Sequence, residues 1–258
     1  MMFPEYKDNE SRPKMHPLSH LFCIFGQLRE KRETVMALRS TKEEKMYLRI
    51  RNLCGILGVI LPWLSLFSAG IAEHHGSEWW WSISATYYVS PALVGVLVPA
   101  CIVLISYIGY DWTDNLITTL SGLFGLGIVL FPCSVGWKTP ETPVGFFQIP
   151  MDVSHILHTI FSCLFFVTIA LNSICQFTKH GSVMTDRKIL RNKIYRICGY
   201  GMLVLMVVFG VARLLGAPGW TVMVVEIILL HLFGFAWLVK GEAFPFFNDV
   251  EEAPSGSR

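Results

Sequence analysis

Three ionisable side chains inside otherwise apolar stretches are the residues of this sequence best suited to chemistry. Glu226 interrupts the run VMVVEIILL, and His155 and His158 fall in DVSHILHT. An ionisable group in hydrocarbon is costly, roughly 2.5 to 3.5 kcal/mol at a helix centre, and usually marks a functional site. Glu226 is suited to act as a general acid or base, as a proton site or as a ligand contact.

The two histidines are spaced so that they share one face of a helix, with Ser162 one turn deeper. They are therefore candidates for an acid–base pair or for two metal ligands. A spacing of H-x-x-H is not a zinc-protease motif, and the sequence fixes no third ligand. We accordingly predict no metal and no cofactor, and we keep Glu226, His155 and His158 as the candidate catalytic residues.

Further polar and aromatic residues are candidates for binding. Arg213 precedes a tight Gly-Ala-Pro-Gly turn and is expected to reach Glu226, which leaves a purely structural ion pair as the alternative role of that carboxylate. His231 lies five residues after Glu226, so the two point about 140° apart on a helix, and a packing role is favoured for His231. The predicted binding residues are Ser84, Tyr87, Tyr88, Arg213 and His231.

These residues lie in or beside six long apolar runs. Only 16% of the 258 residues are charged, whereas 53% are hydrophobic. Each run is close to the roughly 20 residues that a helix needs to cross a bilayer. The runs are 52–71, 91–110, 115–133, 154–176, 194–215 and 220–239. The pattern predicts an all-α fold, a polytopic bundle of six transmembrane helices, and hence a multi-pass membrane protein.

The parts outside the bundle differ in composition. Residues 1–35 are polar and proline-containing, which predicts a disordered extension. Ser40 followed by Glu43 fits a capping box, which predicts a juxtamembrane helix over 36–51. The transmembrane domain then covers 52–240, and 241–258 form a tail. Asp111 and Asp114, at the inner ends of the second and third runs, can reach water or cap a helix, and we interpret them as residues that set the topology.

Basic residues are distributed unequally between the two faces of the predicted bundle. Of 21 lysines and arginines, nineteen fall in segments on one face, and only Lys138 and Arg213 fall on the other. The positive-inside rule therefore predicts that both termini are cytoplasmic. The same asymmetry, with a net charge of only +2, gives no indication of nucleic-acid binding. It also places Glu226, His155 and His158 in the outer half of the bundle.

Seven cysteines are present, and most of them fall inside the apolar runs. None forms a CxxC pair, so neither a disulfide framework nor a zinc ribbon is expected. We interpret them as small packing residues. They are Cys23, Cys54, Cys101, Cys133, Cys163, Cys175 and Cys198.

The order of short motifs resembles a superfamily of six-span proteins, the Frag/DRAM/Sfk-type membrane proteins with their bacterial relatives. The resemblance covers about residues 45–243. The matching features are the pair Ile83-Ser84, the run 120–125 (LSGLFG), the run 154–158 (SHILH), and Glu226 followed by an aromatic helix end. It implies a six-helix bundle and a role in lipid remodelling, lipid organisation or autophagy regulation.

Three functions remain open. The sequence favours a protein that binds or organises membrane lipid, or regulates a partner, through a polar site in the outer half of the bundle. The partner would be membrane lipid, a second copy of the chain or another membrane protein. One alternative is a membrane-embedded enzyme that acts on a lipid through His155, His158 and Glu226. A second is a small proton-coupled transporter that uses Glu226 and His231.

Overall fold

The computed structural model describes residues 17–72, 78–109, 111–179 and 184–248. The chain divides into two compact units, Met1–Met46 and Tyr47–Arg258. The described residues form α-helices with a single two-stranded sheet, so the predicted all-α bundle is confirmed. The helices are α1 (Pro17–Ala72), α2 (Ala92–Ser106), α3 (Trp112–Leu130), α4 (Met151–Leu171), α5 (Asp186–Leu214) and α6 (Thr221–Lys240).

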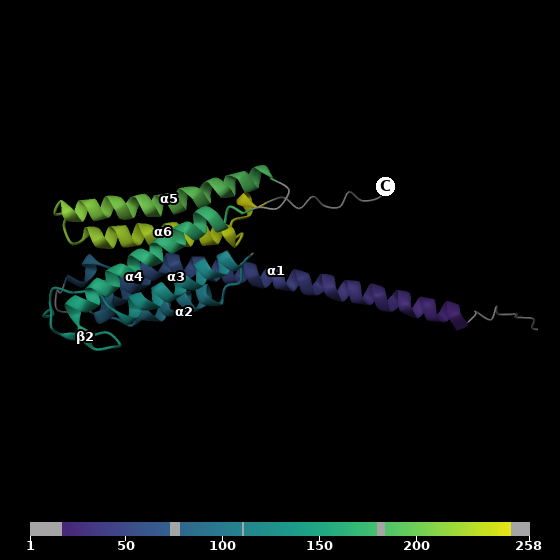
Figure 1. Ribbon diagram of the computed structural model, residues 1–258, viewed down its shortest axis with the longest axis horizontal. Coiled ribbons are helices and arrows are strands. Elements are labelled where there is room, and N and C mark those ends of the chain that lie inside the picture. Colours follow the sequence, from purple (N-terminus) through teal and green to yellow (C-terminus); the bar gives the residue numbers. More distant parts are fainter. Residues whose placement is uncertain (1–16, 73–77, 110, 180–183, 249–258) are drawn as a thin grey trace, which may run out of the picture. The chain divides into compact units, whose positions relative to one another are not determined.

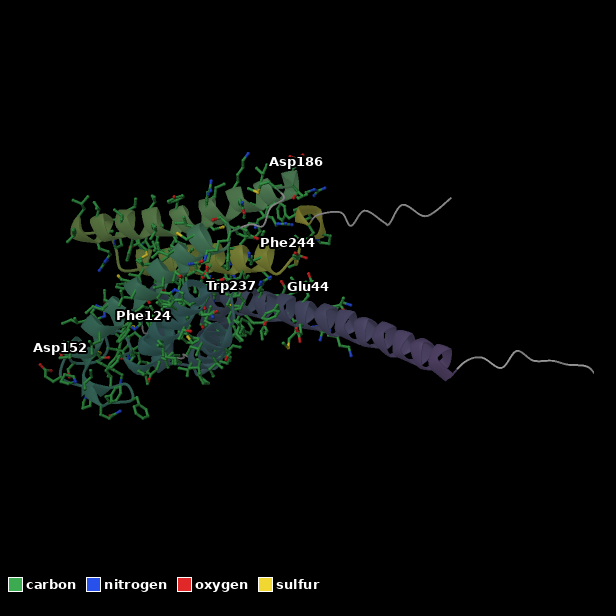
Figure 2. The ribbon with its side chains drawn as sticks, turned by 45° about the vertical axis from the view of Figure 1, so that its right-hand side comes forward. Glu44, Phe124, Asp152, Asp186, Trp237 and Phe244 are labelled. Carbon is green, nitrogen blue, oxygen red and sulfur yellow. The ribbon has the colours of Figure 1, made fainter. Side chains whose placement is uncertain are left out.

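The helices of the second unit run side by side (Figure 1). α4 and α5 start at opposite ends of this bundle, as the labels of Asp152 and Asp186 show (Figure 2). Trp237 of α6 lies between these ends and is fully buried. It contacts the rings of Tyr107 and Phe177, with centroids 5.3 and 5.1 Å away. These aromatic contacts are part of the apolar core of the bundle.

Five helical segments are long and apolar enough to cross a membrane, which makes the chain a multi-pass membrane protein. They are 41–72 of α1, α3, the continuous stretch 151–176, α5 and α6. The stretch 151–176 includes a π-helical turn (η3, Asn172–Gln176) after α4. In four of these segments, 33 to 39% of the apolar stretch is buried inside the bundle, whereas in α5 only 17% is buried. Of the five segments, α5 is therefore the most exposed to its surroundings.

α2 is shorter than predicted. The apolar run suggested a span over 91–110, whereas the helix covers the 15 residues Ala92–Ser106, or about 22 Å. It ends because Tyr107 adopts an extended backbone, with φ −70° and ψ 128°. The hydroxyl of Tyr107 accepts a hydrogen bond from Nε of Arg51, 3.2 Å away. Arg51 of α1 thus contacts the residue that directly follows α2.

The start of α1 also differs from the sequence prediction. The helix begins at Pro17, whereas we expected irregular backbone up to residue 35 and a separate helix over 36–51. The run from 27 to 39 is rich in Leu, Arg, Glu and Lys, which are strong helix formers, so it can continue the helix without a break. Residues 1–16 lie outside the described residues. In the predicted tail, residues 245–247 form a short 3-10 helix (η4, Pro245–Phe247).

The predicted tight connection between α5 and α6 is confirmed. Gly216 takes φ +84°, which a glycine adopts without strain, and Ala217 N–H bonds to the carbonyl of Ala212 at 2.9 Å. The loop between α3 and α4 contains two short antiparallel strands that the sequence did not predict, β1 (Pro143–Val144) and β2 (Ile149–Pro150). We call the end of the bundle that carries these two connections the outer end, following the charge asymmetry.

Asp111 caps α3, as the sequence suggested. Its Oδ1 accepts a hydrogen bond from the backbone N–H of Asp114 at 2.9 Å. Its Oδ2 lies 2.6 Å from Nζ of Lys179, so the cap also carries an ion pair. The hydrogen bond from Lys179, with that from Asp114, holds the pKa of Asp111 below its usual value. Both side chains are largely exposed, so the stabilisation is expected to be small.

Replacing Lys179 by alanine should lower stability slightly at neutral pH and not at all in strong acid. A lowered pKa in the folded state stabilises the protein above the unfolded pKa, and this stabilisation is lost as the pH falls through the folded value. The measurement is the thermal unfolding midpoint in detergent against pH. Lys193→Ala removes an exposed charge from α5 as a control. A Lys179→Ala deficit that persists after Asp111 is protonated would contradict the prediction.

Two basic residues that the sequence assigned only to topology are buried. Lys240, the last residue of α6, is 7% exposed, and its Nζ lies 3.4 Å from the carbonyl of Phe177 and 5.4 Å from the centre of that ring. Arg191 is 9% exposed and donates to the carbonyl of Phe247 at 3.0 Å. Carbonyl oxygens and an aromatic face thus replace part of the water around these cations.

Candidate functional site

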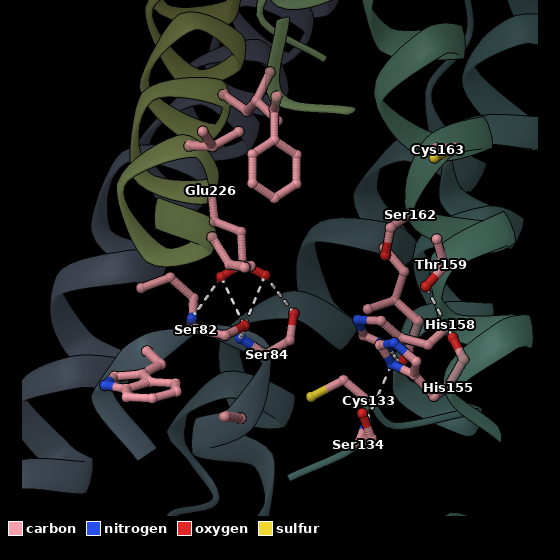
Figure 3. A pocket seen from close by; sticks show the side chains of 18 of the residues that line it. Ser82, Ser84, Cys133, Ser134, His155, His158, Thr159, Ser162, Cys163 and Glu226 are labelled. Atoms are coloured by element: carbon pink, nitrogen blue, oxygen red, sulfur yellow. Dashed lines mark hydrogen bonds between the residues drawn. The ribbon is translucent and has the colours of Figure 1, made fainter. Parts of the chain in front are cut away.

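Glu226 is bound by a short loop segment that precedes α2. The side chain projects from the second turn of α6, and its two oxygens accept hydrogen bonds from three consecutive residues (Figure 3). The Ser82 hydroxyl lies 2.9 and 3.1 Å from the two oxygens, the Ile83 backbone N–H 2.6 Å from one, and the Ser84 hydroxyl 2.8 Å from the other. Charge-assisted hydrogen bonds of this kind are about twice as strong as neutral ones.

The local sequence explains why these donors converge. Ile83 is 2% exposed, and its side chain is part of the apolar core. The 3-10 helix that follows (η2, Ser84–Tyr88) begins directly after it, and the hydroxyl of buried Thr86 bonds back to the carbonyl of Ile83 at 2.6 Å. The backbone is thereby fixed with the hydroxyls of Ser82 and Ser84 on the side of Glu226.

His155 and His158 lie on the opposite wall, on the first two turns of α4 (Figure 3). His155 Nδ1 accepts from the backbone N–H of Ser134 at 3.2 Å, so its Nε2 carries the proton when the ring is neutral. His158 Nδ1 lies 2.9 Å from the carbonyl of Phe131 and 3.3 Å from that of Ile128. It must therefore be protonated there, which leaves Nε2 as an acceptor.

The two walls enclose a cavity of about 690 Å³. Its polar lining comes from the outer parts of the helices and from the loops, including Glu226, His158 and Arg213. Deeper in the bundle the lining is apolar, with Phe165, Phe166, Leu97, Met206, Leu229 and Leu230. The cavity therefore changes from polar to apolar along the helix axes, beginning at the outer end.

The structure brings some of the predicted residues together and leaves others apart. Glu226, His155, His158, Ser84 and Arg213 all line this cavity. Glu226 does not use Arg213 as its partner, because Nη1 of Arg213 donates to the carbonyl of Ala217 at 2.6 Å and the carboxylate is bound by residues 82–84. The structural ion pair that the sequence left open is therefore replaced by a bond between helix and loop.

Tyr87, Tyr88 and His231 are not among the residues that line the cavity. The hydroxyl of Tyr88 donates to the carbonyl of Cys133 at 2.7 Å, and burial raises the pKa of this tyrosine. His231 accepts from Nε1 of Trp63 at 3.0 Å through Nε2, while its Nδ1 bonds to the carbonyl of Ile227 at 2.7 Å. Its hydrogen bonds therefore join α6 to α1 and to its own preceding turn.

Comparisons of the chain with protein-family models, with curated proteins and with solved structures found no match. The resemblance to the Frag/DRAM/Sfk-type proteins thus stays a prediction from the sequence. Within the residues that the structure describes, no group of three or more His, Cys, Asp or Glu side chains is arranged to hold a metal ion.

Sequence reasoning missed several residues of the site. Ser82 and the backbone N–H of Ile83 hold Glu226, and Ser134 orients His155, yet none was a candidate. The sequence signals were the pair Ile83-Ser84 of the family resemblance and the run of small polar residues after the three tryptophans, which is typical of a turn. Ile83 and Ser134 act through their backbone N–H groups, which every residue except proline has. Their residue types therefore could not indicate this role, and only the fold shows it.

Proposed function

We propose that this chain binds a single membrane lipid in the cavity between α4, α5 and α6. The observation that carries the proposal is the polarity gradient of a cavity of about 690 Å³ within the membrane-spanning bundle. Its volume lies in the range of small-molecule sites, which are mostly apolar with a few well-placed polar groups. An acyl chain suits the deep apolar part beside Phe166, Met206 and Leu230, and a headgroup suits the polar outer part.

The polar part offers both donors and acceptors to a headgroup. Arg213 and Nε2 of His155 are donors, whereas Nε2 of His158 is an acceptor. Glu226 contributes mainly by fixing the loop, because residues 82–84 bind both of its oxygens. This favours binding over catalysis, since a general acid or base must reach the substrate with a proton-accepting atom. The position of His231 between α6 and α1 gives no support to a proton path through the cavity.

The test is to fill the cavity and measure the lipid that the protein retains. Ser162 is partly buried and lines the cavity, so Ser162→Phe should occupy the space of an acyl chain. Ile160→Phe, on the same helix at a 49% exposed position that does not line the cavity, is the matched control. Each protein is purified from its membrane in mild detergent, and the retained lipids are counted by native mass spectrometry.

We expect the wild-type protein and Ile160→Phe to retain about one tightly held lipid each, and Ser162→Phe to retain severalfold less at equal thermal stability. The proposal is rejected if the wild-type protein keeps no lipid through extensive washing. It is equally rejected if Ser162→Phe retains as much lipid as the wild type.

A further inference from the structure

α4 and α5 are in close contact toward the end opposite the outer end. A Cβ on Gly199 of α5 would collide with the side chain of Ile174 and lie 2.9 Å from the carbonyl of Ala170, so the two helices meet there with almost no space between them. The buried residues of α5 all lie in this part of the helix, and the last of them is Met202. Contact between α4 and α5 is thus concentrated in the first half of α5.

Toward the outer end the two helices separate, as their ribbons show (Figure 1). Gly210 of α5 is exposed, and a Cβ built on it would meet nothing within 4 Å. On the facing side, Thr159 and Cys163 of α4 are exposed as well. These three residues nevertheless line the cavity. Residues that are both exposed and cavity-lining mark an opening in the wall, so the cavity is open sideways between α4 and α5.

The depth of this opening places it in the hydrocarbon layer. Thr159 and Cys163 lie eight and twelve residues after the start of α4 at Met151, or about 12 and 18 Å along the helix. A hydrocarbon core is roughly 30 Å thick, so the opening lies at the depth of the acyl chains. Its rim consists of small and apolar side chains, including Met206, which a hydrocarbon chain can pass without desolvating a charge.

The opening continues upward to polar groups at the outer rim. Arg213 lies three residues beyond Gly210 on α5 and is exposed, and Ser134, Gly136 and Trp137 are exposed on the connection before α4. All four line the same cavity. On the α6 side, by contrast, the outer end is covered, because the ring of Trp81 packs directly on Gly219 and residues 82–84 are bound to Glu226. The cavity is therefore open along one side, from the rim down to the apolar interior.

We infer that a lipid of the surrounding leaflet enters the cavity sideways through a slit between α4 and α5, which we define by Thr159, Cys163, Met206 and Gly210. Its acyl chain passes between the helices while its headgroup moves along the outer rim and stays in interfacial water. This inference rests on the proposed lipid binding and specifies the ligand. The ligand is a bilayer lipid with at least one free-ended acyl chain, and it arrives from the membrane and not from the aqueous phase.

The slit can be closed at a position where the fold tolerates a side chain. Gly210→Phe places a ring in the opening without a clash at Cβ, and Cys163→Phe does so from the opposite side. Gly95→Phe in α2 is the matched control, because its Cβ also meets nothing within 4 Å and it does not line the cavity. Thermal unfolding of each variant is measured to check that the fold is retained. Two slit variants are used so that the test still stands if one of them misfolds.

The experiment uses phosphatidylcholine with a photoreactive diazirine near the end of one acyl chain, mixed into proteoliposomes of the full chain. After brief illumination, the crosslinked residues are identified by mass spectrometry. In the wild type and in Gly95→Phe we expect crosslinks at the deep cavity residues Leu229 and Leu230, beside those at the exposed face around Ile102 of α2. In Gly210→Phe and Cys163→Phe we expect deep crosslinks to form roughly tenfold more slowly after mixing, with those around Ile102 unchanged.

The possible failures are distinguishable. If the wild type gives crosslinks only on exposed faces, the proposed lipid binding itself fails. If the wild type gives deep crosslinks and both slit variants give them at the same rate, lipid binding stands and sideways passage is overturned.

Discussion

Replacing Glu226 by alanine should lower the free energy of unfolding by about 3 kcal/mol, because three donors lose one charged acceptor at once. The Ser82 and Ser84 hydroxyls and the Ile83 N–H are packed at the covered side of the cavity, where few other acceptors can replace the carboxylate. Glu226→Gln keeps one oxygen that can accept hydrogen bonds, so its free energy of unfolding should fall by about half as much as that of Glu226→Ala. The measurement is the thermal unfolding midpoint in detergent, with all variants at one protein concentration.

A double-mutant cycle separates this network from a general loss of packing. Ser84→Ala should be destabilising in the wild-type background and nearly neutral in Glu226→Ala, because its hydroxyl no longer has a charged partner there. Equal effects of Ser84→Ala in both backgrounds would show that the hydrogen bond contributes nothing. Ile160→Ala, a truncation at an exposed position on another helix, controls for the effect of surface changes on the midpoint.

Replacing Gly234 by alanine should also lower the free energy of unfolding by about 3 kcal/mol, but through a different mechanism. Gly234 of α6 faces Gly55 of α1 at a close helix crossing. A Cβ on Gly234 would lie 2.6 Å from Cγ2 of Val59 and 2.7 Å from the carbonyl oxygen of Gly55. Backbone cannot move aside as a flexible side chain can, so the two helices must separate along their contact. Small residues at such crossings are the usual means of close helix packing in membranes.

Gly95→Ala is the matched control for Gly234→Ala, because it makes the same chemical change in α2, an apolar helix of the same bundle, with open space at Cβ. It should be neutral or slightly stabilising, since alanine is the better helix former. The comparison uses the same unfolding midpoint in detergent. A Gly234→Ala protein as stable as Gly95→Ala would mean that the crossing of α1 and α6 is looser than the structure indicates.

The helices were predictable from sequence because apolar composition and length suffice to define a span. The runs at 115–133, 194–215 and 220–239 match α3, α5 and α6 to within a few residues, apart from the earlier start of α5 at Asp186. That start is fixed by Thr185, whose side chain accepts from the backbone N–H of Lys188 at 3.1 Å. Hydropathy defines only the apolar part of α5, whereas the polar first turns from Asp186 depend on this local cap.

The partner of Glu226 could not be predicted in the same way. Arg213 was the natural choice because it is close in sequence and opposite in charge. The guanidinium of Arg213 instead donates to the carbonyl of Ala217, only four residues away, in the turn that follows α5. The actual donors lie 142 to 144 residues earlier in the chain. Neither charge nor periodicity in the sequence indicates contacts over such a separation.

That separation has a consequence for how the protein is made. Residues 82–84 leave the ribosome long before Glu226, and at roughly 5 to 20 residues per second the interval is about 7 to 29 seconds. During this time the serine hydroxyls and the Ile83 N–H have no carboxylate, although Tyr88 of the same loop can already bond to the carbonyl of Cys133. The loop is secured when α6 inserts with Glu226 toward the outer end. α6 thus completes a loop that is synthesised much earlier, and a chain in which α6 is missing or inverted lacks the carboxylate that binds residues 82–84.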